Sequence, residues 1–318
     1  MSERTPKRLS LTALVGRIYD SMKAALVGTG TKAASFAYEK TPDRFKNASD
    51  LQIRIRTGVV YFVVSVVMTM ACEVTLAILL SVTAAIAALE LCNMLKEDAK
   101  LPNTVLCMLG AAAYPASLIT FDLAGTAVVT AVLGALLLIW YLSDLQIRYT
   151  DVCATMFSAA YTGMTLSCLL TIESTIPGFW GRLVVLGVFA GVWLCDSFAY
   201  LVGRKIGKHK MAPRISPKKS WEGFFAGLVG SALIWVAISF VPGVEMSILQ
   251  AVCFGVICGT AGVLGDLMES RIKRNCGVKD SGTIMPGHGG FLDRTDSMFV
   301  ASPTALALLV IGGCIHVM

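Results

Sequence analysis

Long apolar runs separated by short polar segments dominate the chain from residue 57 onward. A helix needs about 20 apolar residues to cross the hydrocarbon core of a membrane, and most of the runs have about that length. Only helices and closed barrels satisfy every backbone group in lipid, and the alternation that a barrel requires does not occur. The pattern therefore predicts an all-α, polytopic integral membrane protein. We expect about nine transmembrane helices, at residues 57–74, 75–95, 101–120, 125–143, 152–172, 182–203, 221–241, 247–267 and 297–317.

The composition excludes a soluble globular domain. Hydrophobic residues make up 55% of the chain and charged residues only 15%, against about 25% in typical soluble proteins, and the mean hydropathy is +0.70. Most of the 10 cysteines fall inside the predicted helices, and no pair has the spacing of zinc ligands. We therefore expect the cysteines to act as small packing residues.

Basic residues gather at the N-terminus and in two loops, which predicts the orientation in the membrane. Residues 1–56 carry 11 Lys or Arg and 5 Asp or Glu, an excess that equals the net charge of +6 of the whole chain. Because basic segments beside membrane helices stay on the cytoplasmic side, we expect a cytoplasmic N-terminus. Nine helices then place loops 204–219 and 268–296 on the cytoplasmic face of an inner membrane or its equivalent.

Three regions follow from this pattern. Residues 1–56 form a basic cytoplasmic tail, 57–180 the N-terminal transmembrane helices, and 181–318 a transmembrane region that holds the candidate chemistry. In the tail, apolar residues recur at helical spacing between Leu11 and Leu26. An amphipathic helix on the membrane surface and a partly disordered basic tail are both compatible with that spacing.

The segment 265–297 holds five acidic and five basic residues between two apolar runs. Asp266 and Glu269 share one helix face, and Asp293 and Asp296 repeat that spacing where the last predicted helix begins. Carboxylates without His or Cys partners favour a hard cation, so the pattern predicts a Mg²⁺ site. The alternative is an interfacial cluster of salt bridges with the neighbouring Lys and Arg side chains, and the two interpretations are compatible.

Two further segments have features of phosphate-binding sites. The turn Pro286–Gly290 contains consecutive glycines, which let backbone N–H groups approach a ligand, and His288 within it serves either a structural hydrogen bond or acid–base chemistry. Loop 204–220 carries seven Lys or Arg and no acid, and it ends with Ser216–Ser220 at a helix start, where dipole and free N–H groups favour anions. Anchoring to anionic lipid headgroups also accounts for the charge of this loop.

Asp196 is an acidic residue inside the sixth predicted helix, roughly 10 Å from its end. An unpaired charge at that depth is costly, so Asp196 must face a polar cavity or a partner. A functional role and a purely structural polar contact both satisfy this requirement.

Taken together, these segments resemble the phosphatidate cytidylyltransferases, also called CDP-diacylglycerol synthases. Their signature S-x-φ-K-R-x4-K-D-x-[GSA]-x2-φ-P-x-H-G-G-φ-x-D-R-x-D, with φ apolar, is matched by Ser270, Ile272, Lys273, Arg274, Lys279, Asp280, Gly282, Met285, Pro286, His288, Gly289, Gly290, Phe291, Asp293, Arg294 and Asp296. Met285 stands where Leu, Ile or Phe is usual. Upstream segments that are also similar carry Asp196, Tyr200, Gly203, Arg204, Gly207, Lys208, Lys218, Lys219, Ser220 and Glu222.

The resemblance implies an enzyme that transfers the CMP moiety of CTP to phosphatidate, giving CDP-diacylglycerol and pyrophosphate for phospholipid synthesis. It implies Mg²⁺, with a second monovalent cation such as K⁺ as a further expectation. The expected partners are CTP, phosphatidate and membrane lipid, without nucleic acid, and a homodimer is left open.

The same resemblance implies roles for individual residues. The residues expected to carry catalysis are Asp266, Asp293, Lys219, Arg294 and Asp296. The expected metal ligands are Asp266, Glu269, Asp293 and Asp296. The residues expected to bind substrate are Ser216, Lys218, Lys219, Ser220, Lys273, Arg274, His288, Gly289, Gly290 and Asp196.

Two alternatives keep part of this chemistry. A CTP-dependent polyprenol kinase or another CTP:lipid transferase would use similar cations and carboxylates. A cation transporter would also place Asp196, Asp266 and Glu269 inside the membrane, although it would not need a Lys-Lys loop beside a Gly-Gly turn.

Overall fold

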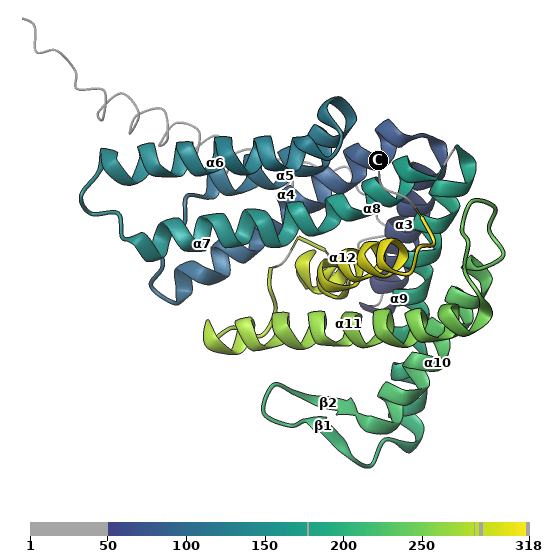
Figure 1. Ribbon diagram of the computed structural model, residues 1–318. Helices are drawn as coiled ribbons and strands as arrows, with labels where there is room; N and C mark the ends of the chain where they lie inside the picture. The colour runs from purple at the N-terminus through teal and green to yellow at the C-terminus, as the bar shows by residue number, and fades with distance from the viewer. Residues whose placement is uncertain (1–49, 177, 283, 286–288, 316–318) are drawn as a thin grey trace, which may run out of the picture. The chain divides into compact units, whose positions relative to one another are not determined.

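The computed structural model describes residues 50–315 except 177, 283 and 286–288 (Figure 1). The chain divides into two units, residues 1–55 and 56–318. The architecture below is that of the second unit, together with the start of its first helix. The segment between Leu11 and Leu26, with its predicted amphipathic helix, lies outside the described residues.

Nine helices occur within the described residues, counting one that contains a π-helical turn as a single helix. They are α3 (Asp50–Ala71), α4 (Glu73–Glu97), α5 (Thr104–Phe121), α6 (Ala124–Ser143), α7 (Tyr149–Ala159) continued by η1 (Ala160–Met164) and α8 (Thr165–Thr175), α9 (Phe179–Ile206), α10 (Trp221–Ile238), α11 (Ile248–Asn275) and α12 (Asp296–Ile311). Seven are long and apolar enough to cross a membrane, while α12 and the apolar part of α3 are shorter. The predicted all-α membrane fold is confirmed.

A single residue separates the first two helices, which nearly abut in the sequence pattern. Cys72 is extended, with φ −164° and ψ 169°, and its backbone N–H donates to the Thr75 hydroxyl at 3.1 Å. That contact satisfies one of the free N–H groups at the start of α4. The boundary therefore falls at Cys72, two residues before the predicted one.

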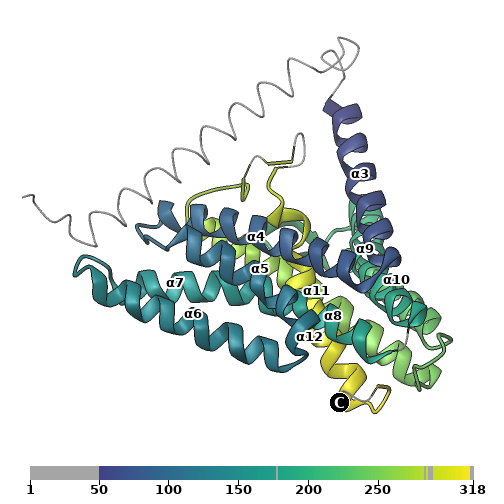
Figure 2. The ribbon, with the colours of Figure 1, turned by 90° about the horizontal axis from the view of Figure 1, so that it is seen from above.

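Helix α12 lies in the middle of the helix group. It packs against α8, α9 and α11, while α4 packs against α5, α7 and α8 on one side and α9 packs against α10 on the other (Figures 1 and 2). The buried side chains of these contacts form one apolar core, with Leu91, Leu169 and Phe299 almost fully enclosed. Residues at the start of α12 are thus surrounded by several other helices.

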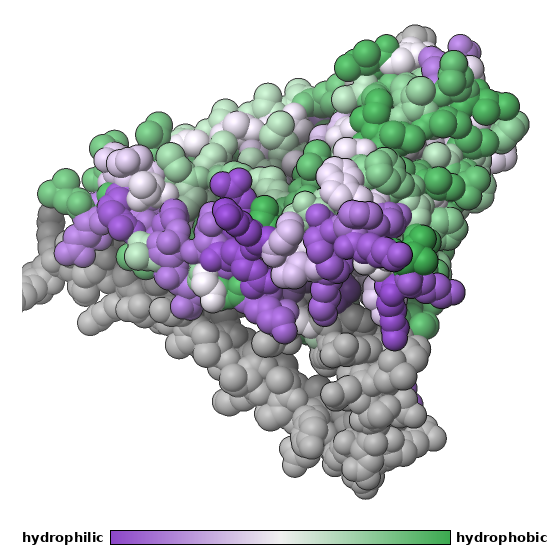
Figure 3. Space-filling view, turned by 90° about the horizontal axis from the view of Figure 1, so that it is seen from below, coloured by the Kyte–Doolittle hydropathy of each residue, from purple (hydrophilic) through white to green (hydrophobic). Residues whose placement is uncertain are grey.

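The outer helix faces are apolar. Leu136, Ile139 and Leu142 of α6 are 44%, 65% and 80% exposed, which suits contact with lipid rather than water. Hydrophilic side chains instead gather in one area of the face seen from below, beside a wide hydrophobic surface (Figure 3). A separate polar end is what a chain embedded in a membrane requires.

Backbone contact between α11 and α12 fixes the position of the candidate site. A Cβ atom added at Gly265 would lie 2.6 Å from the Asp296 carbonyl oxygen and 3.1 Å from the Ser297 Cα atom. Only glycine permits such a close crossing. Asp266 follows this glycine directly, so the crossing brings it beside the start of α12.

The basic loop between α9 and α10 forms a small antiparallel hairpin, which the sequence pattern did not predict. Its strands are β1 (Lys210–Ala212) and β2 (Ser216–Ser220), with Lys210 opposite Ser220. Successive side chains in a strand point to opposite sides. Accordingly, Lys218 is exposed and Lys219 is partly buried against the helices.

Candidate active site

Lys219 links the hairpin to α11. Its Nζ atom lies 2.9 Å from Asp266 Oδ2 and donates to the Val263 carbonyl oxygen at 3.2 Å. The other oxygen of Asp266 accepts a hydrogen bond from the Ser270 hydroxyl at 3.2 Å. Both oxygens of Asp266 therefore have partners, and the lysine of the strand reaches the helix crossing.

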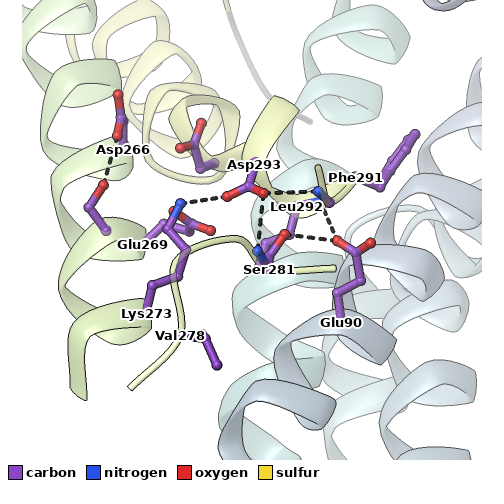
Figure 4. A network of polar contacts seen from close by, with 12 residues as sticks. Glu90, Asp266, Glu269, Lys273, Val278, Ser281, Phe291, Leu292 and Asp293 are labelled. Atoms are coloured by element: carbon purple, nitrogen blue, oxygen red, sulfur yellow. Dashed lines mark hydrogen bonds and ion pairs between the residues drawn. The ribbon is translucent and has the colours of Figure 1, made fainter. Parts of the chain in front are cut away.

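Lys273 joins the two acidic pairs predicted from the sequence. Its Nζ atom lies 2.5 Å from Glu269 Oε2 and 2.5 Å from Asp293 Oδ1, between α11 and the short 3₁₀ helix η2 (Leu292–Arg294) (Figure 4). Glu269 is completely buried and Lys273 nearly so. A buried carboxylate needs a cationic partner, and one ammonium here serves two of them.

The second oxygen of Asp293 is held by the backbone of the segment between α11 and α12, residues 276–295, which we call the signature loop. Oδ2 accepts hydrogen bonds from the N–H groups of Ser281 at 3.1 Å and Gly290 at 3.0 Å. Burial by itself would raise the pKa of Asp293. The charge and hydrogen bond of Lys273 and the hydrogen bond from the Ser281 N–H have a larger effect, so the pKa lies below its ordinary value. Asp293 is therefore an anion at neutral pH.

Gly289 provides the backbone conformation that this loop needs. Its φ of +85° lies in the left-handed region, and an added Cβ would lie 3.2 Å from Asp293 Oδ2. A residue with a side chain would be strained there. The glycine pair predicted to cradle a phosphate thus also holds Asp293, because the Gly290 N–H already donates to its carboxylate.

Asp296 begins α12 inside the same group of charges. Its Oδ1 atom accepts a hydrogen bond from the Ser297 N–H at 2.7 Å. The carboxylates of Asp266, Glu269 and Asp196 lie close enough to repel its charge, and Asp196 on α9 is in turn attracted by Lys219 and Arg294. The structure therefore brings residues of five elements together, namely α9, β2, α11, η2 and α12.

We call these five acids the acidic cluster. Its members are Asp196, Asp266, Glu269, Asp293 and Asp296. Among the described residues, the cationic side chains that contact or face it are Lys219, Lys273 and Arg294. Five carboxylates facing three cations leave an excess of negative charge if all are ionised, and such an excess favours a bound cation.

The donor set fits Mg²⁺, because carboxylate oxygens are the ligands that this ion prefers. In the arrangement seen here, lysine ammonium groups lie between the carboxylates, and no three His, Cys, Asp or Glu side chains of the described residues are placed to share one ion. Salt-bridge pairing, the alternative interpretation of the sequence, is therefore present. It involves Lys273 and Lys219 in this structure.

Several predicted substrate residues lie elsewhere or have other partners. The Ser220 hydroxyl is buried and accepts a hydrogen bond from the Gly223 N–H at 3.3 Å, so it caps α10. Arg274 donates to the Val278 carbonyl oxygen at 3.3 Å at the exposed end of α11. Ser216 and Lys218 lie on the hairpin, and His288 lies outside the described residues.

Glu90, which is not among the site residues predicted from the sequence, contacts the signature loop from α4. This side chain is only 2% exposed and accepts hydrogen bonds from the Ser281 hydroxyl at 3.0 Å and the Leu292 N–H at 2.8 Å (Figure 4). The available signal was an acidic residue within an apolar run, which often marks a functional position. Nothing in the spacing could have named its partners, 191 and 202 residues away.

Comparison with known proteins identifies the family of the chain. Residues 52–311 match the cytidylyltransferase family. Proteins named phosphatidate cytidylyltransferase from Staphylococcus epidermidis, Staphylococcus haemolyticus and Staphylococcus aureus are each 39% identical over 169 residues, which make up 53% of this chain and 63% of each relative. The aligned part thus covers less than two thirds of those proteins. Because the family match spans most of the chain and includes every residue of the acidic cluster, the chain belongs to the cytidylyltransferase family.

Proposed function

We propose that this protein is a phosphatidate cytidylyltransferase, which transfers the CMP moiety of CTP to phosphatidate and produces CDP-diacylglycerol and pyrophosphate. The observation that carries the proposal is the meeting of the acidic cluster with Lys219, Lys273 and Arg294 at the ends of membrane helices. The names of the similar bacterial proteins support the choice of substrates.

In the proposed reaction, a phosphate oxygen of phosphatidate attacks the α-phosphorus of CTP. A new P–O bond forms, the bond between the α-phosphorus and the bridging oxygen to the β-phosphate breaks, and pyrophosphate leaves. The attacking oxygen is already ionised at neutral pH, so no strong general base is needed. Positioning and charge stabilisation then account for most of the catalysis, as in other phosphoryl transfers.

Mg²⁺, when bound, would neutralise charge on the transferred and leaving phosphates. Asp266, Glu269, Asp293 and Asp296 are its proposed ligands, and a monovalent cation such as K⁺ is a further proposed occupant of the cluster. Lys219 and Arg294 are the proposed contacts for the phosphates of the substrates. Lys273 keeps Glu269 and Asp293 together, which preserves the distance between α11 and the loop.

The lipid substrate would enter sideways from the membrane. Its acyl chains can remain against apolar outer faces such as that of α10, where Phe225, Val229 and Leu233 are all more than half exposed. Asp266 and Lys219 are partly exposed, so a headgroup can approach them from the polar end. We propose that this end faces the cytoplasm, in agreement with the basic loops beside it.

The decisive experiment uses purified protein in detergent with Mg²⁺, phosphatidate and CTP labelled at either the α- or the γ-phosphorus. We expect the α label to enter a lipid and the γ label to leave as pyrophosphate, and both to depend on phosphatidate and to stop with a chelator. Entry of the γ label into lipid would identify a lipid kinase instead. No labelling of lipid by either nucleotide would contradict the proposal.

A further inference from the structure

Glu90 connects α4 to two separate points of the signature loop through one oxygen atom. Its Oε2 atom accepts the Ser281 hydroxyl at 3.0 Å and the Leu292 N–H at 2.8 Å, although these two residues lie 11 positions apart (Figure 4). Among the described residues, no other acid outside this loop accepts hydrogen bonds from two of its residues. The loop is therefore closed against α4 by a single carboxylate.

The two residues held by Glu90 are both directly connected to Asp293. Ser281 donates its backbone N–H to Asp293 Oδ2, and Leu292 immediately precedes Asp293 in the chain. A shift of either one moves or releases the carboxylate. Glu90 thus acts on Asp293 through one hydrogen bond and one peptide unit.

Two glycines of the loop make room for this contact. A Cβ atom at Gly282 would lie 2.4 Å from Glu90 Oε1, and one at Gly290 would lie 2.7 Å from Glu90 Oε2 and 1.8 Å from the Ser281 hydroxyl oxygen. Real Cβ atoms do not approach oxygen so closely, so both positions require glycine as long as Glu90 occupies its place. The loop and the acid fit each other closely.

A buried carboxylate at position 90 lowers the free energy of unfolding. Glu90 is 2% exposed within a helix that is apolar enough to span a membrane, and no described group donates a hydrogen bond to its Oε1 atom. A buried carboxylate with an unpaired oxygen destabilises the fold more than an apolar residue of similar size would. Packing alone therefore gives no reason for a glutamate here.

We propose that Glu90 is a positioning residue for the acidic cluster. It fixes the loop so that Asp293 directs Oδ1 toward Lys273 and Glu269 while Oδ2 is held by the backbone. Because Asp293 is a ligand in the proposed Mg²⁺ site, this inference rests on the proposed function. Removal of a group that orients a metal ligand typically lowers metal affinity or activity by about 10- to 100-fold.

The test compares Glu90→Ala and Glu90→Gln with Glu173→Ala. Glu173 is a matched control, since it is also a buried glutamate (7% exposed) but lies 3.8 Å from Arg182, away from the loop. We expect Glu90→Ala to raise the Mg²⁺ concentration for half-maximal activity by about tenfold or more. Glu90→Gln should stay within about threefold of wild type, because its amide oxygen can accept the same two hydrogen bonds.

Hydrogen exchange supplies a second measurement that does not depend on turnover. The amides of Ser281, Gly290 and Leu292 donate to Asp293 or Glu90, so Glu90→Ala should speed their exchange while leaving α11 protected. Should Glu90→Ala not fold, Ser281→Ala removes one of the two donors without changing α4. It should raise the Mg²⁺ requirement and loop exchange in the same direction.

The inference is overturned if Glu90→Ala, or Ser281→Ala in its place, matches Glu173→Ala in both Mg²⁺ requirement and loop exchange. Failure of the proposed function has a different signature. In that case the wild-type protein makes no CDP-diacylglycerol at any Mg²⁺ concentration. Loop exchange would still decide whether Glu90 holds the loop.

Discussion

At the scale of single residues, Lys273 determines how the acidic cluster is arranged. Lys273 lies one turn of α11 after Glu269, so its ammonium meets that carboxylate on the same helix face. The ammonium also contacts Asp293 of η2. Removing one partner of a buried ion pair is far more damaging than replacing the whole pair, because a charge is left uncompensated. The three side chains therefore behave as one unit.

Replacing Asp293 by Asn tests the role of its negative charge. The amide is nearly isosteric, and its oxygen can still accept the hydrogen bonds from the Ser281 and Gly290 N–H groups, while Lys273 keeps Glu269 as a counter-ion. We therefore expect a protein that folds and can be extracted, with a lower unfolding free energy than wild type because the Lys273–Asp293 ion pair is lost. Activity should fall by about 100-fold or more, since a proposed metal ligand is lost. Radiolabelled CTP turnover measures this effect.

The control for that variant is Asp144→Asn, in an exposed segment after α6. It should keep wild-type turnover. Activity of Asp293→Asn within about twofold of wild type would remove Asp293 from the metal site.

At the scale of elements, the crossing of α11 and α12 should tolerate no added volume. Gly265→Ala would place a methyl group 2.6 Å from the Asp296 carbonyl oxygen, so the helices must separate. We expect a loss of about 1–3 kcal/mol in unfolding free energy, together with reduced turnover, because Asp266 and Asp296 move apart. Thermal unfolding in detergent and the CTP assay report the two effects.

Gly134→Ala in α6 is the matched control, since an added Cβ there meets no atom within 4 Å. Replacing a helical glycine in open space typically stabilises by about 0.5–1 kcal/mol. Equal stability and activity of the two alanine variants would show that the α11–α12 crossing can accommodate a methyl group at position 265.

The hairpin offers a similar comparison between adjacent lysines. Lys219 contacts Asp266 and Val263, whereas Lys218 points to the exposed side of the same strand. Lys219→Ala should lower kcat/KM by an amount equivalent to about 1.5–3 kcal/mol, the range for one charge-assisted hydrogen bond. Lys218→Ala should have little effect.

Parallel losses in the two variants would favour the interpretation of the loop as a general membrane anchor. Titration of activity against anionic lipid content would separate the two roles, since anchoring depends on lipid charge.

The sequence predicted the helices well, because the length of an apolar run is set by membrane thickness and needs no tertiary information. The hairpin was missed, since strands of three and five residues leave no clear local pattern. The pairing of Lys273 with Asp293 and the contact of Glu90 with the loop depend on which helices meet. Spacing along one helix placed Asp266 beside Glu269 but could not show that Lys219 reaches Asp266.

At the scale of the whole molecule, segments from distant parts of the chain build the site together. Helix α4 supplies Glu90. Helix α3 supplies Tyr61, whose ring packs edge-on against the ring of Phe291 in the signature loop, with 5.9 Å between the ring centroids. Helices α9, α11 and α12, the 3₁₀ helix η2 and the hairpin supply the charged groups of the acidic cluster and its cationic partners. The amino-terminal helices are therefore more than a membrane anchor for the carboxyl-terminal part.

Binding of Mg²⁺ should stabilise this whole assembly. A ligand at 100 times its Kd adds about 2.7 kcal/mol to the unfolding free energy when it binds only the folded state. We expect a higher unfolding temperature in Mg²⁺ than in a chelator for the wild-type protein, and a much smaller difference for Asp293→Asn. The same shift in both proteins would place the ion elsewhere.

The position of Asp293 and Asp296 after α11 has a consequence for biosynthesis. During translation, α9 and α11 enter the bilayer with Asp196, Asp266 and Glu269 before the last helix is made. Until η2 and α12 are made, Lys273 lacks Asp293 as its second counter-ion, and α8, α9 and α11 lack the helix that packs between them. A chain that ends before residue 292 would therefore keep only Glu269 as a counter-ion for Lys273 and would leave the packing faces of α8, α9 and α11 uncovered.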